Sequence, residues 1–132
     1  MTSPLTLDPD GRCPCLTGEV YGACCGPLHS GAAAAPTAER LMRSRFTAFA
    51  RHDASYLLCT WAAATRPASL DFDPDIRWTR LDIRRTERGG MLDTVGVVEF
   101  RAHYRVDREP GDQHEVSTFI REGGRWVYEG AL

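Results

Sequence analysis

The chain has 132 residues, a hydrophobic content of 42% and a charged content of 26%, which fit one globular domain with a small appendage and exclude a disordered chain or a coiled coil. The formal net charge of −2 argues against a domain that binds nucleic acid by neutralising phosphates. No apolar run approaches the roughly 20 residues of a membrane span, and the N-terminal MTSPLTLDPDG lacks the basic start and apolar core of a signal peptide. We therefore expect a cytoplasmic protein with no membrane partner, whose thiols stay reduced.

Most of the chain's cysteines lie close together, with the spacing Cys13-x-Cys15, eight intervening residues, then Cys24-Cys25. Four thiolates can surround Zn²⁺ tetrahedrally, and such a closed shell is structural. A disulfide clasp and a redox-active pair are the alternatives; the first is disfavoured in a reducing compartment and the second lacks a C-x-x-C motif. Zinc is the favoured interpretation. His29 could replace one thiolate, but beside four cysteines we interpret it as an ordinary loop histidine.

This spacing resembles the SEC-C motif, a small zinc-binding module also found at the C-terminus of the SecA translocation ATPase. The positions that match its pattern are Cys13, Pro14, Cys15, Gly18, Tyr21, Cys24, Cys25 and Gly26. Leu16 and Thr17 replace the usual Gly-Ser, and Glu19 stands where a Lys is frequent. These departures spare the ligands and weaken any transfer of a basic binding surface. The resemblance implies a tail and a SEC-C-like zinc knuckle over residues 1–31, with structural Zn²⁺ held by the four cysteines.

Two helices are expected after a short connector that ends at Pro36. Thr37 is suited to cap the first helix, whose apolar residues recur at helical spacing and are interpreted as core: Leu41, Met42, Phe46 and Phe49. Asp53 is suited to cap a second helix that runs through Trp61 and buries Cys59. Residues 66–75 predict a loop with one helical turn around Ser69.

From residue 76 the pattern changes to strands over residues 77–87, 94–106, 114–122 and 125–131, with turns at Gly89-Gly90, at residues 108–113 and at Gly123-Gly124. The second strand alternates clearly. Its apolar set is expected to face the helices, and its outer set is Glu99, Arg101, His103 and Arg105. Two helices followed by an antiparallel meander of about four strands predict an α+β domain with the helices on one face of a curved sheet.

That order resembles the YchJ-like (UPF0225) family, whose members join a SEC-C motif to an NTF2-like domain. The most specific pieces are the cysteine motif, APTAERLMRSRFTAFARHDASYLLCTW and HEVSTFIREGGRWVYEG. The resemblance implies an NTF2-like cone over residues 36–132. Longer members carry a second SEC-C motif at the C-terminus, which is not found here, and Ala62-Ala63 stands where His-Pro often follows Thr-Trp.

The mouth of such a cone can hold a small ligand. Arg43 and Arg45 lie about 200° apart on a helix, so one of them must approach the core or the cone and there needs a carboxylate such as Glu115. That arginine either ties the helix to the sheet, which we favour, or binds an anion. The possible pocket comprises Arg43, Arg45, Tyr56, Trp61, Glu115 and Ser117. No Ser-His-Asp set, phosphate loop or convincing carboxylate pair is found, so no catalytic residue is assigned and the sequence leans away from an enzyme.

The leading hypothesis is a zinc-binding adaptor that contacts another protein through the knuckle. The alternative is a small-molecule-binding protein or enzyme that uses the cone. Because the predicted outer face of the sheet is strongly charged, and charges are depleted at the centres of stable interfaces, we expect a monomer or a weak homodimer.

Overall fold

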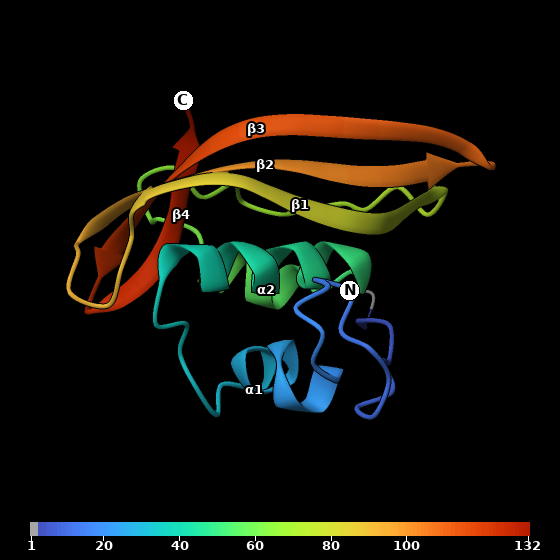
Figure 1. The fold of residues 1–132 in the computed structure, drawn as a ribbon, viewed down its shortest axis with the longest axis horizontal. Helices are drawn as coiled ribbons and strands as arrows, with labels where there is room; N and C mark the ends of the chain where they lie inside the picture. The colour runs from blue at the N-terminus through green and yellow to red at the C-terminus, as the bar shows by residue number, and fades with distance from the viewer. Residues whose placement is uncertain (1–2) are drawn as a thin grey trace.

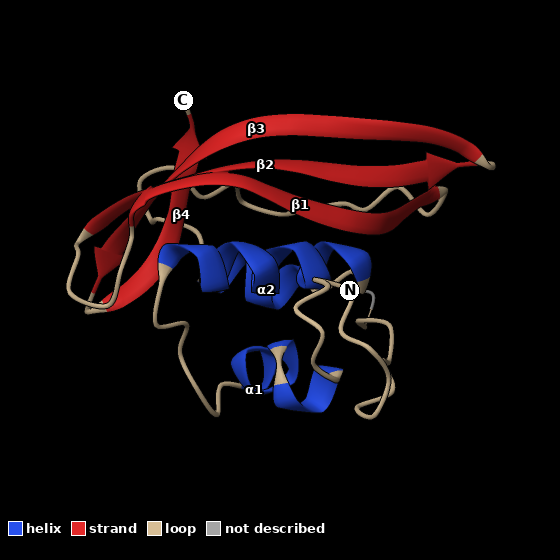
Figure 2. Cartoon of the chain, viewed as in Figure 1, coloured by secondary structure: helices blue, strands red, loops and turns tan. Residues whose placement is uncertain are grey.

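The protein is arranged in three layers, described by a computed structural model over residues 3–132 (Figure 1). A four-stranded antiparallel sheet forms the first layer. Helices α2 (Ala38–Ala50) and α3 (Ala54–Cys59) lie on one face of this sheet, and the N-terminal segment with the short helix α1 (Cys25–Ser30) lies on the far side of α2 (Figure 2). Within the described residues, no helix is long and apolar enough to cross a membrane.

Both predicted helix caps are confirmed. The side chain of Thr37 accepts a hydrogen bond from the backbone N–H of Arg40 at 3.1 Å, and Asp53 accepts one from the N–H of Tyr56 at 3.1 Å. Each cap satisfies a backbone donor that the first turn leaves free. Helix α3 ends at Cys59, two residues before the predicted end, and Trp61 lies beyond it in a short bridge to β4.

Two predictions, one for the end of α3 and one for the loop that follows it, are wrong. Cys59 is exposed, because α3 buries Tyr56 and Leu57 and a residue two positions after Leu57 points to the opposite side of the helix. No helical turn forms around Ser69; residues 66–73 form an irregular loop. Its sequence is rich in Pro and Asp and lacks the run of helix-forming residues that a helical turn needs.

The sheet is a meander in the order β1-β2-β3-β4, as the sequence predicts. The strands are β1 (Ile76–Arg88), β2 (Val95–Val106), β3 (Glu109–Glu122) and β4 (Arg125–Ala131). The turn predicted over residues 108–113 is wrong. The chain reverses over Asp107 and Arg108 alone, both with positive φ (50° and 75°), and β3 starts at Glu109. Positive φ at both central residues is the geometry of a two-residue hairpin.

Pro110 and Gly111 therefore lie within a strand. Among residues 3–132, β4 pairs with β3 only from Ser117 onward, so the first half of β3 is an edge, where proline is tolerated. Gly111 pairs with Tyr104 of β2, and a Cβ at Gly111 would lie 2.6 Å from the Tyr104 ring. The glycine is needed because the tyrosine ring lies across the backbone of β3.

The predicted faces of β2 are confirmed. Val98, Phe100 and Ala102 are buried against α2, where they join the core that α2 and the other strands complete. The remaining core residues are Ala38, Leu41, Met42, Phe46, Leu81, Phe119 and Trp126. Register shifts in β1 at residues 78–80 and 83–85 mark irregularities of the kind that bend a strand, and here the sheet curves over the helix.

The outer face of the sheet carries ion pairs between neighbouring strands. Arg85 pairs with Glu99 at 3.2 Å, and Glu99 also accepts from His114 at 2.7 Å. Arg101 pairs with Asp112 on β3. Several of these charges are therefore paired within one chain, and the face presents charged groups to a second copy in place of an apolar surface.

We predict that the protein is a monomer or a weak dimer at micromolar concentration, and that any dimer weakens as salt is raised, because exposed charges are screened within about 10 Å at 0.1 M ionic strength. Sedimentation equilibrium at low and high salt measures this. A tight dimer that salt does not affect would contradict the prediction.

Candidate functional site

The four clustered cysteines form a closed, buried group of sulfur atoms. Cys13, Cys15 and Cys25 are fully buried and Cys24 is 6% exposed. Their Sγ atoms all lie within 4.8 Å of one another, and the Cys15 and Cys24 sulfurs are 3.5 Å apart. Tetrahedral Zn–S bonds of about 2.3 Å place sulfurs roughly 3.8 Å apart, whereas a disulfide needs about 2.05 Å. The cysteines are free thiols, so the arrangement fits a metal better than a disulfide clasp.

The local backbone of the knuckle (residues 12–26) explains how the two cysteine pairs meet. Arg12 and Val20 form an isolated antiparallel bridge, and the Cys13 N–H donates to the Glu19 carbonyl at 2.9 Å. The loop between them reverses through Gly18, whose φ is 98°. Gly26 is also required, since a Cβ there would lie 2.8 Å from the Tyr21 carbonyl oxygen. The two glycines of the motif allow the backbone to turn tightly, and this brings the four sulfur atoms together.

Helix α2 supplies donors to the cysteine cluster. Arg40 donates from Nη2 to Cys24 Sγ at 3.3 Å and from Nη1 to Cys25 Sγ at 3.7 Å. Arg43 donates to the Cys15 carbonyl at 2.8 Å. A four-thiolate zinc centre carries a net charge of −2, and a cation bonded to its sulfurs stabilises that charge. Arg40 is thus a cation at the cysteine cluster that the sequence did not reveal.

Without a metal, the thiols compete for protons. Hydrogen bonds from Cys15 and Cys25 lower the pKa of the Cys13 thiol. The reciprocal effect raises the pKa of Cys15 to about 11 and also raises that of Cys25. A thiolate is thus favoured at Cys13 while Cys15 and Cys25 stay protonated, so a metal that bound these sulfurs would release protons.

His29 is not part of the sulfur cluster, and it lies in α1 rather than in a loop. Its Nε2 is 2.8 Å from the Ser44 carbonyl and its Nδ1 is 2.7 Å from the Tyr21 hydroxyl. The carbonyl can only accept, so Nε2 carries the proton and Nδ1 accepts from Tyr21. Burial lowers the pKa of His29. This neutral histidine joins the knuckle to the backbone of α2.

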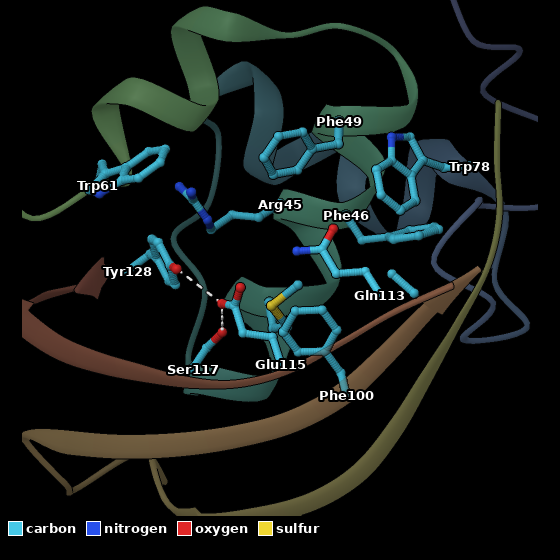
Figure 3. Close-up of a pocket in the computed structure, with 12 residues that line it drawn as sticks. Arg45, Phe46, Phe49, Trp61, Trp78, Phe100, Gln113, Glu115, Ser117 and Tyr128 are labelled. Atoms are coloured by element: carbon cyan, nitrogen blue, oxygen red, sulfur yellow. Dashed lines mark hydrogen bonds between the residues drawn. The ribbon is translucent and has the colours of Figure 1, made fainter. Parts of the chain in front are cut away.

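A second candidate site lies on the opposite side of α2, in a cavity of about 270 Å³ between that helix and the sheet (Figure 3). Aromatic side chains dominate its walls. The lining residues are Met42, Arg45, Phe46, Phe49, Trp61, Trp78, Phe100, Ala102, Gln113, Glu115, Ser117 and Tyr128. Such a small, mostly apolar cavity with a few converging polar groups is the usual form of a small-molecule site.

Arg45 lines this cavity although only 3% of its surface is exposed. Nη1 donates to the Leu57 carbonyl at 2.8 Å and to Thr60 Oγ1 at 2.7 Å. The guanidinium carbon lies 5.0 Å from the Trp61 ring centroid and 4.8 Å from that of Tyr128. Burial lowers the Arg45 pKa to about 10, so the side chain stays charged at neutral pH. The expected carboxylate partner is absent: among residues 3–132, no Asp or Glu forms an ion pair with Arg45.

Glu115 faces the same cavity from β3 and is bound by other side chains. Its Oε2 accepts from the Tyr128 hydroxyl at 3.0 Å and from Ser117. Burial, followed by the Glu115 charge, raises the pKa of Tyr128 to about 12, so this tyrosine remains a donor. The cavity thus has a cation on the helix side and a carboxylate on the sheet side.

Comparison with known proteins assigns the fold. The family described as the YchJ middle NTF2-like domain matches residues 37–131. A UPF0225 protein of Streptomyces coelicolor is 55% identical over 120 residues, covering 91% of this chain and 94% of that protein, and one of Corynebacterium efficiens is 54% identical over 124 residues, covering 94% and 95%. The chain belongs to the UPF0225 family.

Solved structures extend the UPF0225 assignment to the knuckle. The solution structure of a SEC-C motif containing protein from Rhodopseudomonas palustris superposes with a TM-score of 0.79 at 31% identity, covering 91% of this chain and 96% of that one. A SEC-C motif containing protein from Psychrobacter arcticus gives 0.74 at 26% identity, covering 89% and 79%. The fold is therefore α+β, with a SEC-C motif before an NTF2-like domain.

Of the six residues that the sequence of this UPF0225 protein suggests for the pocket, four line the cavity and two do not. Arg45, Trp61, Glu115 and Ser117 line the cavity. Arg43 and Tyr56 do not: Arg43 contacts the knuckle, and the Tyr56 hydroxyl bonds Ser44. Cavity residues that sequence reasoning missed include Trp78, Gln113 and Tyr128. The sequence places Gln113 in the turn predicted over residues 108–113, and alternation within a strand does not show which inward-facing side chains leave a space between them.

We predict that His29 makes the protein less stable in mild acid. A lowered pKa in the folded state means that the unfolded state binds more protons below the ordinary value of 6.5. The free energy of unfolding therefore falls as pH drops through that value, by at most about 1.4 kcal/mol per pH unit for one proton. His29→Gln keeps a donor and an acceptor but cannot titrate there. When the free energy of unfolding in urea is measured between pH 7.5 and 5.5 and plotted against pH, the slope should be shallower for this variant than for the wild type.

His114→Gln is the matched control, since His114 is an exposed histidine on the outer face of the sheet. Equal slopes for His29→Gln and the wild type would contradict the role assigned to His29.

Proposed function

We propose that this protein is a small-molecule-binding protein whose site is the NTF2-like cone, and that a structural Zn²⁺ in the knuckle stabilises the helix on which the site depends. The observation that carries the proposal is Arg45, a buried cation that lines a cavity without a carboxylate partner. A buried charge that only fixes a helix to a sheet is normally paired within the protein. An arginine held by neutral groups beside an open space is suited to a ligand.

The zinc part of the proposal is supported by the donor set. Four converging cysteine sulfurs are the ligands of structural Zn²⁺, and their spacing leaves no room for an open coordination position. Zinc bound there would replace the thiol protons and hold the two halves of the knuckle together. Because Arg40 and Arg43 reach the knuckle from α2, the metal would also fix that helix.

We predict about one zinc per chain in freshly purified protein, measured by elemental analysis. Cys15→Ser and Cys24→Ser should each lose most of the metal, since a serine hydroxyl is a poor zinc ligand beside thiolates. Cys59→Ser is the matched control and should keep its zinc, because Cys59 lies outside the cluster. Metal-free protein that had never met a chelator would refute the zinc site.

We predict that small molecules enter the cone and shift the backbone amide signals of Arg45, Glu115 and Tyr128 in ¹H–¹⁵N spectra when a mixed set of acids, amines, alcohols and neutral aromatics is added. Gln113→Trp should abolish these shifts, because Gln113 is an exposed residue that lines the cavity and a large ring there would fill it.

His114→Trp is the matched control. His114 is the next residue on β3, so its side chain points to the outer face; there it pairs with Glu99. The His114→Trp variant should therefore bind ligands as the wild type does. If none of the compounds shifts the cone amides, or if both variants behave alike, the cone is not the binding site.

A protein-binding role for the knuckle is the second candidate. Leu16 and Val20 expose 40% and 39% of their surface, and both lie on the loop between the two cysteine pairs. Two apolar side chains on a metal-braced loop would suit a shallow contact with another protein. Serine at both positions would remove that contact and leave ligand binding in the cone intact, so the two roles can be separated.

A further inference from the structure

We propose that the ligand of the cone is a small aromatic monocarboxylate that also carries a hydrogen-bond donor, such as a hydroxyl group, at the end opposite its carboxylate. This inference rests on the proposed function, since it names the chemical class that the same cavity would accept. It follows from three features of the cavity wall: the free edge of one guanidinium, the aromatic side chains, and a carboxylate oxygen on the sheet side.

The first feature is the unused edge of Arg45. A guanidinium has five N–H groups, and both groups on Nη1 are taken by the Leu57 carbonyl and Thr60 Oγ1. No described residue accepts from Nε or Nη2, and neither atom is among the buried groups sealed from solvent. Nε and Nη2 lie on one edge, where two parallel N–H groups match the two oxygens of a carboxylate. The protein thus occupies one end of the guanidinium and leaves the bidentate edge free.

The surroundings of Arg45 hold its guanidinium in one orientation, so the free edge selects a ligand by the direction of its oxygens as well as by its charge. Trp61 and Tyr128 pack on the guanidinium from two directions, with ring planes 78° apart. Two rings and two acceptors fix the orientation of the group before a ligand arrives. A preorganised cation that is already desolvated gains more from a carboxylate than an exposed arginine does.

The second feature is the apolar wall, which favours a flat ring over a flexible chain. Phe46 and Phe49 of α2 meet Trp78 of β1 edge-on or tilted, at centroid distances of 6.2 and 6.4 Å. Aromatic rings prefer such offset or edge contacts with one another. A volume of about 270 Å³ lies just below the usual range of ligand pockets, about 300 to 1,000 Å³, and therefore suits one ring or two fused rings.

The third feature lies on the sheet side, where Glu115 and Gln113 enter the cavity from β3 (Figure 3). Tyr128 and Ser117 both donate to Oε2 of Glu115, and no described residue donates to Oε1. This free oxygen can accept from a ligand hydroxyl or amine. Its negative charge also repels a second acidic group, which is why the ligand class is a monocarboxylate.

The test uses 4-hydroxybenzoate as the probe, titrated into the 132-residue chain at pH 7 while backbone amide shifts are followed by NMR. Benzoate lacks the donor, phenol lacks the carboxylate, and hexanoate lacks the ring. We expect 4-hydroxybenzoate to bind most tightly, with benzoate next and the other two weakest. Inorganic phosphate serves as a simple anion and should not shift the cone amides.

Two variants on opposite walls assign the contacts. Arg45→Lys keeps a positive charge but loses the fork, and it should weaken both aromatic acids by about ten-fold or more and leave phenol unchanged. Glu115→Gln should reduce the advantage of 4-hydroxybenzoate over benzoate, because a hydrogen bond to a charged acceptor is the stronger one. The dispersion of the amide spectrum shows whether each variant is folded, and each variant tests a different end of the ligand.

Equal binding of phenol or hexanoate, or aromatic acids that bind Arg45→Lys as tightly as the wild type, would overturn the ligand class. In that case, binding of other compounds that Gln113→Trp abolishes would still support the cone as a site. If no compound of any class binds in the cone, then both this inference and the proposed function are wrong.

Discussion

Helix α2 is buried on two opposite sides, and the rest of the structure depends on this. One stripe contacts the knuckle, α1 and the N-terminal segment, and it comprises Arg40, Arg43, Ser44 and Thr47 of α2 with the C-cap residue Arg51. Met42, Arg45, Phe46 and Phe49 form the opposite stripe, which lines the cavity. At 100° per residue, the two sets lie about 180° apart. One helix of 13 residues thus carries the contacts of both candidate sites.

This arrangement would couple a metal bound by the four cysteines to the cavity through the position of α2. A knuckle without a bound metal would have four mutually close thiols and no central bond, and its contacts with Arg40 and Arg43 would have less to hold them. The helix would then keep its contacts with the sheet, α1 and α3 and lose the support of the knuckle. Arg45 needs its guanidinium held to well under 1 Å to present two parallel donors. In this view the knuckle acts on the cone through the position of α2, without touching a ligand.

The sequence predicted what is local and missed what depends on distant neighbours. The cysteine spacing, the caps Thr37 and Asp53 and the faces of β2 each depend on a short segment, and all agree with the structure. The 200° separation of Arg43 and Arg45 shows that they point apart, but which one enters the cavity depends on how α2 docks. Arg45 does not have the expected carboxylate partner. The segment at the end of α3 supplies a carbonyl, a hydroxyl and one aromatic ring in its place, and β4 supplies a second ring. Pro110 and Gly111 predict a turn, but the strand accepts them because Pro110 lies on a sheet edge and the Tyr104 ring covers Gly111.

The long β2–β3 hairpin also bears on how the protein behaves at high concentration. Among the described residues, no strand pairs with the outer edge of β3 before Ser117, and the Leu132 N–H bonds only the Val116 carbonyl there; an unpaired strand edge is a template on which other chains can aggregate. Pro110 offers no N–H to an incoming strand, and Asp112 and His114 place polar side chains along the same stretch. The proline that predicts a turn therefore protects the edge of β3 against pairing with another chain. A β-branched residue at position 110 would raise the strand propensity of this segment and make the protein more prone to aggregate.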